Sequence, residues 1–349
     1  MSRPRIALLA VTVMIGFAGL ASTLWAQSRP AQQNGIWVAK WEKDAVVGSS
    51  IRRVSPADEG TYLQPMMHPD GTKVVFWGRG PGADRRETDI WVVNVNGTDC
   101  HRVTTDGKRN EGAAWTADGR IIWSSERGGE GCLRIWVMDA DGKNAQPVTA
   151  GGPAAHDTRP CTSPDGKWAV FGSNRQGGAE QKLWRAPLAG GGKAEAVAQG
   201  AGTYARPVFS HDGKRLAYFT TDTPTKQFNL VVLDWPDGKP RQPIRLGSGD
   251  NLRGPFWMRD NKRVMAHGRL DSSTSAQMYL VDVDSGKWKA VSVPGAVSSG
   301  HATFDRDETV VSFDGSVVPP KSPTPLGTRP LATTASSPSS QTSAPAASH

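Results

Sequence analysis

The side chains that could do chemistry recur at a fixed distance before a repeated acidic turn. The aspartate that opens each turn is 47 or 48 residues from the next, at positions 70, 118, 165, 212, 260 and 307. Six positions before these aspartates stand Gln64, Gly112, Arg159, Arg206, Gly254 and His301. Arginine can bind a carboxylate through two parallel hydrogen bonds, and Gln and His can add further polar contacts. This set therefore predicts a pocket for an anionic or sugar-like ligand.

Polar residues beside these positions extend the predicted pocket, and tyrosines among them offer stacking surface. A second set of arginines follows the next predicted strand of several units, at Arg79, Arg127, Arg175 and Arg269. The structural alternative is that arginines of the repeat tie one unit to the next through backbone carbonyls. The candidate ligand-binding residues are Gln64, Glu111, His156, Arg159, Tyr204, Arg206, Arg253 and His301.

The elements that must position these residues are β-strands. Asp-Gly between runs of β-branched or aromatic residues indicates a tight hairpin turn. Strand-forming runs follow the turns, as at residues 74–77 and 168–171, and a second apolar run comes about 17–20 residues after each aspartate. A polar turn and a short closing strand complete most units. Four strands in each of six units, with almost no helical periodicity, predict an all-β, six-bladed β-propeller.

The sixth unit lacks its outer half at the C-terminal end. Residues 304–313 supply two strands, whereas residues 35–39 and 51–55 copy the third and fourth strands of the repeat. We expect these N-terminal strands to complete the last blade, because a closed ring removes exposed sheet edges. The predicted propeller spans residues 35–316. Trp115 and Trp257, three positions before their aspartates, are expected to pack between blades.

Several units resemble the TolB-type, or PD40, branch of WD40-like propellers. The segments that carry the resemblance are residues 163–166 (Ser-Pro-Asp-Gly), 173–175 (Ser-Asn-Arg), 124–127 (Ser-Ser-Glu-Arg) and 135–139 (Ile-Trp-Val-Met-Asp). The resemblance covers residues 35 to about 315 and implies the propeller fold. It says less about function, because this fold carries translocation proteins, peptidase domains and a lyase. TolB has an α/β domain before its propeller, whereas 34 residues precede the first predicted strand here, so its partner-binding role does not simply transfer.

Resemblance to the oligogalacturonate lyase type of propeller implies a second function, a polysaccharide-active enzyme. That family holds a metal on His and Gln at the axial face, and the matching candidates here are Gln64, His156 and His301. They come from separate units without tight spacing, which argues against a metal site. No Gly-x-Ser-x-Gly elbow, Cys-x-x-Cys pair or phosphate-binding loop occurs either. We therefore expect no cofactor and no catalytic residues.

The two ends of the chain differ in composition from the repeats. Residues 1–26 have the basic, apolar and small-residue regions of a signal peptide, with an uncleaved anchor as the alternative. Residues 321–349 contain 22 Ser, Thr, Pro or Ala in 29 positions, which predicts a disordered tail. The cysteines are Cys100, Cys132 and Cys161. Buried free thiols are favoured, with a Cys132–Cys161 disulfide as the alternative.

Charge narrows the possible partners. The formal net charge is +8, but Arg3, Arg5, Lys321 and Arg329 lie in the end segments, which leaves +4 for the rest. This mild excess argues against nucleic acid, which favours a concentrated basic stripe. We expect a monomeric periplasmic or secreted protein that binds a protein, a peptide or an acidic glycan at the axial funnel. A membrane contact is expected only if the N-terminal segment is uncleaved.

Overall fold

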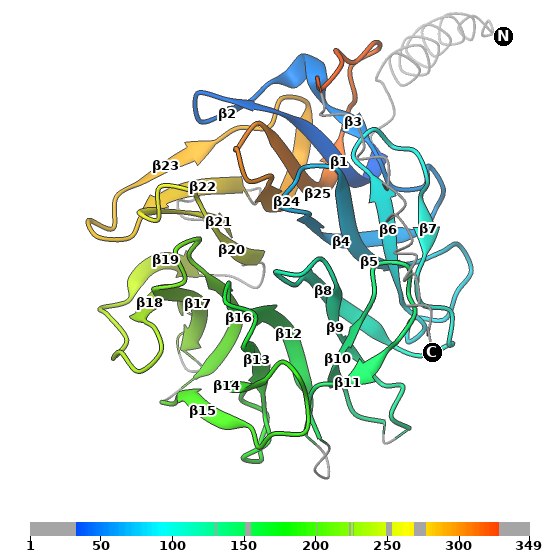
Figure 1. Ribbon diagram of the computed structural model, residues 1–349. Coiled ribbons are helices and arrows are strands. Elements are labelled where there is room, and N and C mark those ends of the chain that lie inside the picture. The colour runs from blue at the N-terminus through cyan, green and yellow to red at the C-terminus, as the bar shows by residue number, and fades with distance from the viewer. Residues whose placement is uncertain are drawn as a thin grey trace, which may run out of the picture.

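The computed structural model describes residues 33–129, 131–150, 155–200, 202–222, 225, 227–248, 253–268 and 277–327. Over these ranges the strands form six antiparallel sheets, five of them four-stranded. The sheets are arranged around a central axis as the blades of a propeller (Figure 1). The predicted all-β, six-bladed propeller is confirmed, and the helical content of the described part is one 3₁₀ turn, Gly48–Ser50.

Each blade begins with an inner strand next to the axis and continues outward by hairpins. Blade one contains β4 (Thr61–Met67), β5 (Lys73–Arg79), β6 (Asp89–Asn94) and β7 (His101–Arg102). Blade two contains β8 (Asn110–Trp115), β9 (Ile121–Ser125), β10 (Arg134–Met138) and β11 (Gln146–Pro147). Blade three contains β12 (Asp157–Thr162), β13 (Trp168–Ser173), β14 (Lys182–Pro187) and β15 (Glu195–Ala198).

Blades four and five repeat this order, and blade four has the longest outer strands of the five four-stranded blades. Blade four contains β16 (Thr203–Phe209), β17 (Arg215–Asp222), β18 (Gln227–Asp234) and β19 (Ile244–Ser248). Blade five contains β20 (Arg253–Trp257), β21 (Arg263–Gly268), β22 (Gln277–Asp282) and β23 (Trp288–Val291). The outermost strands are the shortest in several blades, which limits the edge available for pairing with another chain.

Blade six is built from both ends of the described chain. Its inner strands are β24 (Ala296–Phe304) and β25 (Val310–Val317), and its outer strands are β1 (Gln33–Glu42), β2 (Ala45–Val46) and β3 (Arg52–Arg53). β1 pairs with β25 in continuous antiparallel register from Gln33 opposite Val317 to Lys40 opposite Val310. β3 pairs with β1 on its other side. The predicted closure of the last blade by N-terminal strands is therefore confirmed.

Tryptophans join neighbouring blades as well as filling space. The indole N–H of Trp115 in blade two donates to the Met66 carbonyl of blade one at 2.9 Å. The indole N–H of Trp257 in blade five donates to the Val208 carbonyl of blade four at 3.1 Å. Trp257 is 1% exposed, whereas Trp115 is half-buried. Both positions lie between blades, as predicted from the repeat.

The two end segments are only partly described. The predicted signal peptide, residues 1–26, lies outside the described residues, as do residues 328–349 of the predicted tail. The first residues of that tail contact the propeller: the Thr324 N–H donates to the Ser49 carbonyl at 2.7 Å, and Leu326 is buried. Disorder therefore stays a prediction for residues 328–349 alone. In the part of the chain that the structure places, no helix has the length and apolar character needed to cross a bilayer.

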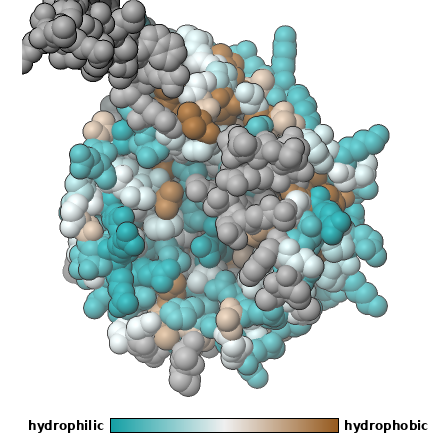
Figure 2. Space-filling view, turned by 180° about the vertical axis from the view of Figure 1, so that it is seen from behind, coloured by the Kyte–Doolittle hydropathy of each residue, from teal (hydrophilic) through white to brown (hydrophobic). Residues whose placement is uncertain are grey.

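The cysteines and the surface complete the description of the fold. Cys100, Cys132 and Cys161 are all free thiols, the state that the sequence favoured. Seen from behind, hydrophobic residues form small separate patches between hydrophilic ones (Figure 2). Two large hydrophobic side chains of the described ranges stand out as exposed, Trp288 at 43% and Val297 at 59%.

Replacing Trp257 by alanine should lower the free energy of unfolding by about 3–5 kcal/mol, because it empties a large buried site between blades four and five. The matched control is the exposed Trp288, whose replacement by alanine should cost under about 1 kcal/mol. Urea unfolding followed by circular dichroism measures both. Equal losses for the two variants would contradict the packing described here.

A chain that begins at residue 56 should fail to fold cooperatively or should aggregate, because β25 would lose its partner β1 and expose a long sheet edge. A chain that begins at residue 33 and ends at residue 327 keeps every described strand and is the control. Light scattering and thermal melting compare the two. A monomeric shorter chain with the same melting temperature would show that closure by β1 is dispensable.

Candidate functional site

The inner strand of every blade carries a β-bulge at the same place. Its register against the second strand shifts across two intervening residues, for example between Leu63 and Met66 in β4 and between Ala205 and Val208 in β16. Proline is the second of these two residues in four blades, at Pro65, Pro160, Pro207 and Pro255. Proline has no N–H for the ladder, so a bulge tolerates it where a regular strand would not.

The first residue of most bulges adopts a left-handed backbone conformation. The φ angles are 55° at Gln64, 51° at Arg159, 58° at Arg206 and 45° at His301. In residues other than glycine this conformation strains the backbone and costs free energy. Such residues concentrate at functional sites. At Gly112, with a φ of 64°, an added Cβ would lie 3.2 Å from the Cα of Arg159, so glycine also leaves room for its neighbour.

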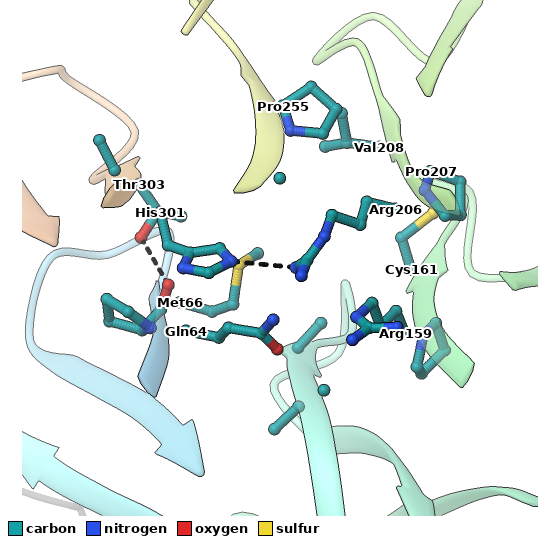
Figure 3. Close-up of a pocket in the computed structure, with 17 residues that line it drawn as sticks. Gln64, Met66, Arg159, Cys161, Arg206, Pro207, Val208, Pro255, His301 and Thr303 are labelled. Carbon is teal, nitrogen blue, oxygen red and sulfur yellow. Dashed lines mark hydrogen bonds between the residues drawn. The ribbon is translucent and has the colours of Figure 1, made fainter. Parts of the chain in front are cut away.

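The bulges converge on one cavity around the propeller axis (Figure 3). Its volume is about 90 Å³. The six positions predicted from the repeat all line it: Gln64, Gly112, Arg159, Arg206, Gly254 and His301. The 47- or 48-residue spacing therefore brings one residue from each blade to the same place.

A chain of hydrogen bonds crosses this cavity from blade four to blade one. Arg206 Nη1 lies 2.9 Å from His301 Nε2, and His301 Nδ1 lies 2.7 Å from Asp314 Oδ2. The same Asp314 oxygen accepts the Gln64 backbone N–H at 2.9 Å. A guanidinium can only donate, so Nε2 accepts and the ring proton is on Nδ1, facing Asp314. The imidazole is held in one tautomer and one orientation.

Asp314 was not among the predicted site residues. It is 1% exposed and lies in β25, at the position that Ser124 occupies in β9 of blade two. Ser124 performs the same task there, since its hydroxyl accepts the Arg159 backbone N–H at 3.1 Å. The second strands of the repeats align in the same way as the inner strands, and this alignment is the sequence signal that places a carboxylate at position 314.

Arg159 contributes a second cationic side chain to the cavity. Its Nε is buried and has no hydrogen-bond partner among the described residues. Cys161, two residues further along β12, lies in the cavity wall, and burial raises the pKa of its thiol. The thiol is therefore neutral and does not offset the charge of the arginines.

Three other predicted site residues, Glu111, His156 and Tyr204, are not among the side chains that line the cavity. Glu111 is buried in an ion pair with Arg109 at 2.9 Å. The His156 Nδ1 accepts the Leu133 backbone N–H at 3.2 Å. Tyr204 stacks on Tyr218, with 5.6 Å between ring centroids. The side chain of Arg253 is outside the part of the chain that the structure describes. Glu111, His156 and Tyr204 are close to the bulges in sequence, but their side chains make these other contacts instead of lining the cavity.

Two arginines of the second set, Arg127 and Arg175, contact carboxylates within their own blades. Arg127 Nη2 lies 2.8 Å from Asp106, and its guanidinium lies 4.9 Å from the Trp123 ring centroid. Arg175 Nη2 lies 2.8 Å from both oxygens of Asp157, which is fully buried. These arginines bind carboxylates near the start of their own blade, not carbonyls of the next. Arg269 is outside the described ranges.

The metal set implied by the lyase resemblance is not assembled. Gln64 and His301 line the same cavity, but His156 does not. Within the described ranges no three His, Cys, Asp or Glu side chains form a group that could hold a metal ion.

Comparison with known proteins identifies relatives of the fold. No family model matches the chain. Tricorn protease homolog 1 of Streptomyces coelicolor is 31% identical over 159 residues, which is 44% of this chain and 14% of that protein. The structure of TolB from Acinetobacter baumannii has a TM-score of 0.56 at 16% identity, covering 89% of this chain and 73% of TolB. Oligogalacturonate lyase from Vibrio parahaemolyticus has a TM-score of 0.50 at 9% identity, covering 81% of this chain and 98% of the lyase.

These similarities establish the fold that the residues had suggested. TolB and related propeller proteins are the structural neighbours of this chain, and the match to the tricorn homolog spans a small part of that protein. These neighbours share one fold but have different named activities. A shared fold therefore does not assign an activity to this chain, since function depends on the site. The chain is a six-bladed propeller of TolB-like architecture.

Replacing Asp314 by alanine should lower the free energy of unfolding by about 3 kcal/mol, because it removes two hydrogen bonds to a buried carboxylate. Ser124→Ala removes one neutral hydrogen bond at the equivalent place in blade two and should cost about 1 kcal/mol. Asp314→Asn keeps a hydrogen-bond acceptor, so its loss in the free energy of unfolding should fall between those of Asp314→Ala and Ser124→Ala. Urea unfolding at neutral pH ranks the variants, and an Asp314→Ala loss no larger than that of Ser124→Ala would refute the assigned role.

Proposed function

We propose that this protein is an exported, non-catalytic binding module that captures a carboxylate of a protein or peptide partner in its axial cavity. The observation that carries the proposal is the convergence of Arg159 and Arg206 on one cavity from strained bulge positions. Strained non-glycine backbone at equivalent positions of several blades is the kind of outlier that marks functional sites. The N-terminal signal sequence supports export.

The charges around the cavity favour an anion. Arg159 and Arg206 are both cationic, and like charges close together are tolerated more easily when an anion can enter. Asp314, a carboxylate beside the cavity, is engaged by His301 and the Gln64 backbone. The buried Arg159 Nε lacks a hydrogen-bond partner in the described part, so an incoming carboxylate would supply one.

The size of the cavity narrows the ligand. A volume of about 90 Å³ is several times the space of about 10–15 Å³ that one buried water needs. A carboxylate group, whether of a peptide or of an acidic glycan, fits this space. An acidic peptide terminus or side chain is therefore the first candidate, and an acidic glycan that inserts only its carboxylate is the second.

A polysaccharide-active enzyme is the alternative function. The observation that favours it is the His301–Asp314 pair, in which a buried carboxylate orients an imidazole at the cavity. The contact of Nε2 with Arg206 occupies the nitrogen that would take a proton. Incubation with polygalacturonate tests this alternative, since a lyase would generate unsaturated ends that absorb in the ultraviolet.

The binding proposal is tested by fluorescence anisotropy with a labelled acidic peptide that has a free C-terminus, the same peptide amidated, a neutral peptide and trigalacturonate as competitor. The acidic peptides should bind, and binding should weaken with added salt because the charges lie near solvent. Arg159→Ala and Arg206→Ala should each weaken binding about tenfold or more, the range of a hydrogen bond to a charged group. Their melting temperatures should change little.

The matched control is Arg86→Ala, which removes an exposed arginine from the loop between β5 and β6. It should bind like the unaltered chain. Failure of every probe to bind, or equal weakening by Arg86→Ala and Arg206→Ala, would refute the proposed site.

A further inference from the structure

A second hollow lies at the rim of the propeller, away from the axial cavity. It is bounded by β19 and the residues before it in blade four, and by the β22–β23 turn and β23 in blade five. Figure 1 shows β19 and β23 at the same side of the disc. Gly286 of the turn faces Ile244 of β19, since an added Cβ would lie 3.8 Å from its Cγ2. Two neighbouring blades therefore form the two walls of one groove.

The groove has the size of a ligand site. Its volume is about 470 Å³, against about 90 Å³ for the axial cavity. Sites for small molecules and cofactors measure about 300–1,000 Å³. The groove can accommodate a whole sugar ring and offers more space than the axial cavity.

An exposed aromatic ring forms part of the wall. Trp288 is 43% exposed, whereas Trp37, Trp123 and Trp257 are fully buried. Its ring meets that of the buried Tyr279 edge-on, with centroids 5.2 Å apart and planes at 88°. This contact supports the indole from one side and leaves part of the ring exposed. A rigid, half-exposed indole offers an apolar face at little cost in side-chain entropy.

Planar polar groups are held in place beside this ring. Arg241 donates to Asp284 at 3.0 Å and to Asp234 at 2.8 Å, so the guanidinium is fixed between two carboxylates. Arg215 also approaches Asp284, at 3.7 Å. A sugar hydroxyl both donates and accepts, so it can donate to Asp284 and accept from Arg241.

The charges that line the groove are largely paired with one another. Its charged lining residues are Arg241, Arg245 and Asp284, and Asp234 further neutralises Arg241. The axial cavity, by contrast, is lined by the two arginines Arg159 and Arg206. The groove therefore fits a neutral polyhydroxyl ligand better than a polyanion.

We propose that the groove between blades four and five binds a neutral glycan, with one pyranose ring stacked on Trp288 and its hydroxyls hydrogen-bonded to Asp284 and Arg241. The site is independent of the axial cavity and binds without covalent chemistry. A protein that captures an acidic group on its axis would thereby hold a glycan chain at its rim.

The test uses the full chain and saturation-transfer NMR with four neutral oligosaccharides: the tetrasaccharides of β-1,4-linked glucose, N-acetylglucosamine, mannose and xylose. At least one should receive saturation on its ring protons. Trp288→Ala should raise the Kd of that sugar about tenfold or more, and Trp288→Phe, which keeps an aromatic face, by less. Asp284→Asn should weaken binding by removing a charged acceptor.

Two controls separate this site from the axial one and from general surface effects. Val297→Ala removes the other exposed hydrophobic side chain and should leave sugar binding unchanged. Arg206→Ala should also leave it unchanged, so failure of the carboxylate site and failure of the groove are distinguishable. The proposal is overturned if no sugar of the panel binds, if a folded Trp288→Ala variant binds equally well, or if trigalacturonate binds in the groove more tightly than the neutral sugars.

Discussion

The pairing of β1 with β25 is the interaction on which the rest of the structure depends. An open stack of six sheets would leave β25 with a free edge and would hold blade six against blade one by side-chain packing alone. The eight paired positions from Gln33 to Lys40 join the beginning of the propeller to its end. Once the ring is closed, the inner strands can only face a common axis, so residues far apart in the sequence become neighbours.

The axial cavity follows from this closure together with the bulges. A regular inner strand would alternate its side chains between its two faces and present no side chain along the axis. The bulge breaks that alternation at one position in each blade and turns Arg159, Arg206 and His301 toward the centre. Asp314, from the second strand of blade six, then holds two of the cavity residues in place. Its carboxylate accepts hydrogen bonds from the His301 side chain and from the Gln64 backbone.

The propeller thus has two regions of different chemical character. The axial cavity is small, cationic and built from strained backbone, whereas the groove at the rim is larger, nearly neutral and built around the exposed Trp288. The difference arises because every blade contributes one bulge residue to the axis, but only blades four and five shape the groove. A repeat protein can in this way combine a site that uses all of its units with one that uses two neighbours.

The sequence by itself determined the fold, the closure of blade six and the convergence of Gln64, Arg159, Arg206 and His301, because a period of 47 or 48 residues carries each of these. It also placed Trp115 and Trp257 between blades. Only the tertiary structure decided that Glu111, His156 and Tyr204 lie away from the cavity, that Asp314 supports it, and that Trp288 is exposed beside Arg241. Side-chain direction at a bulge and contacts between blades depend on local backbone geometry and on neighbours in space, neither of which is encoded in the spacing of a repeat.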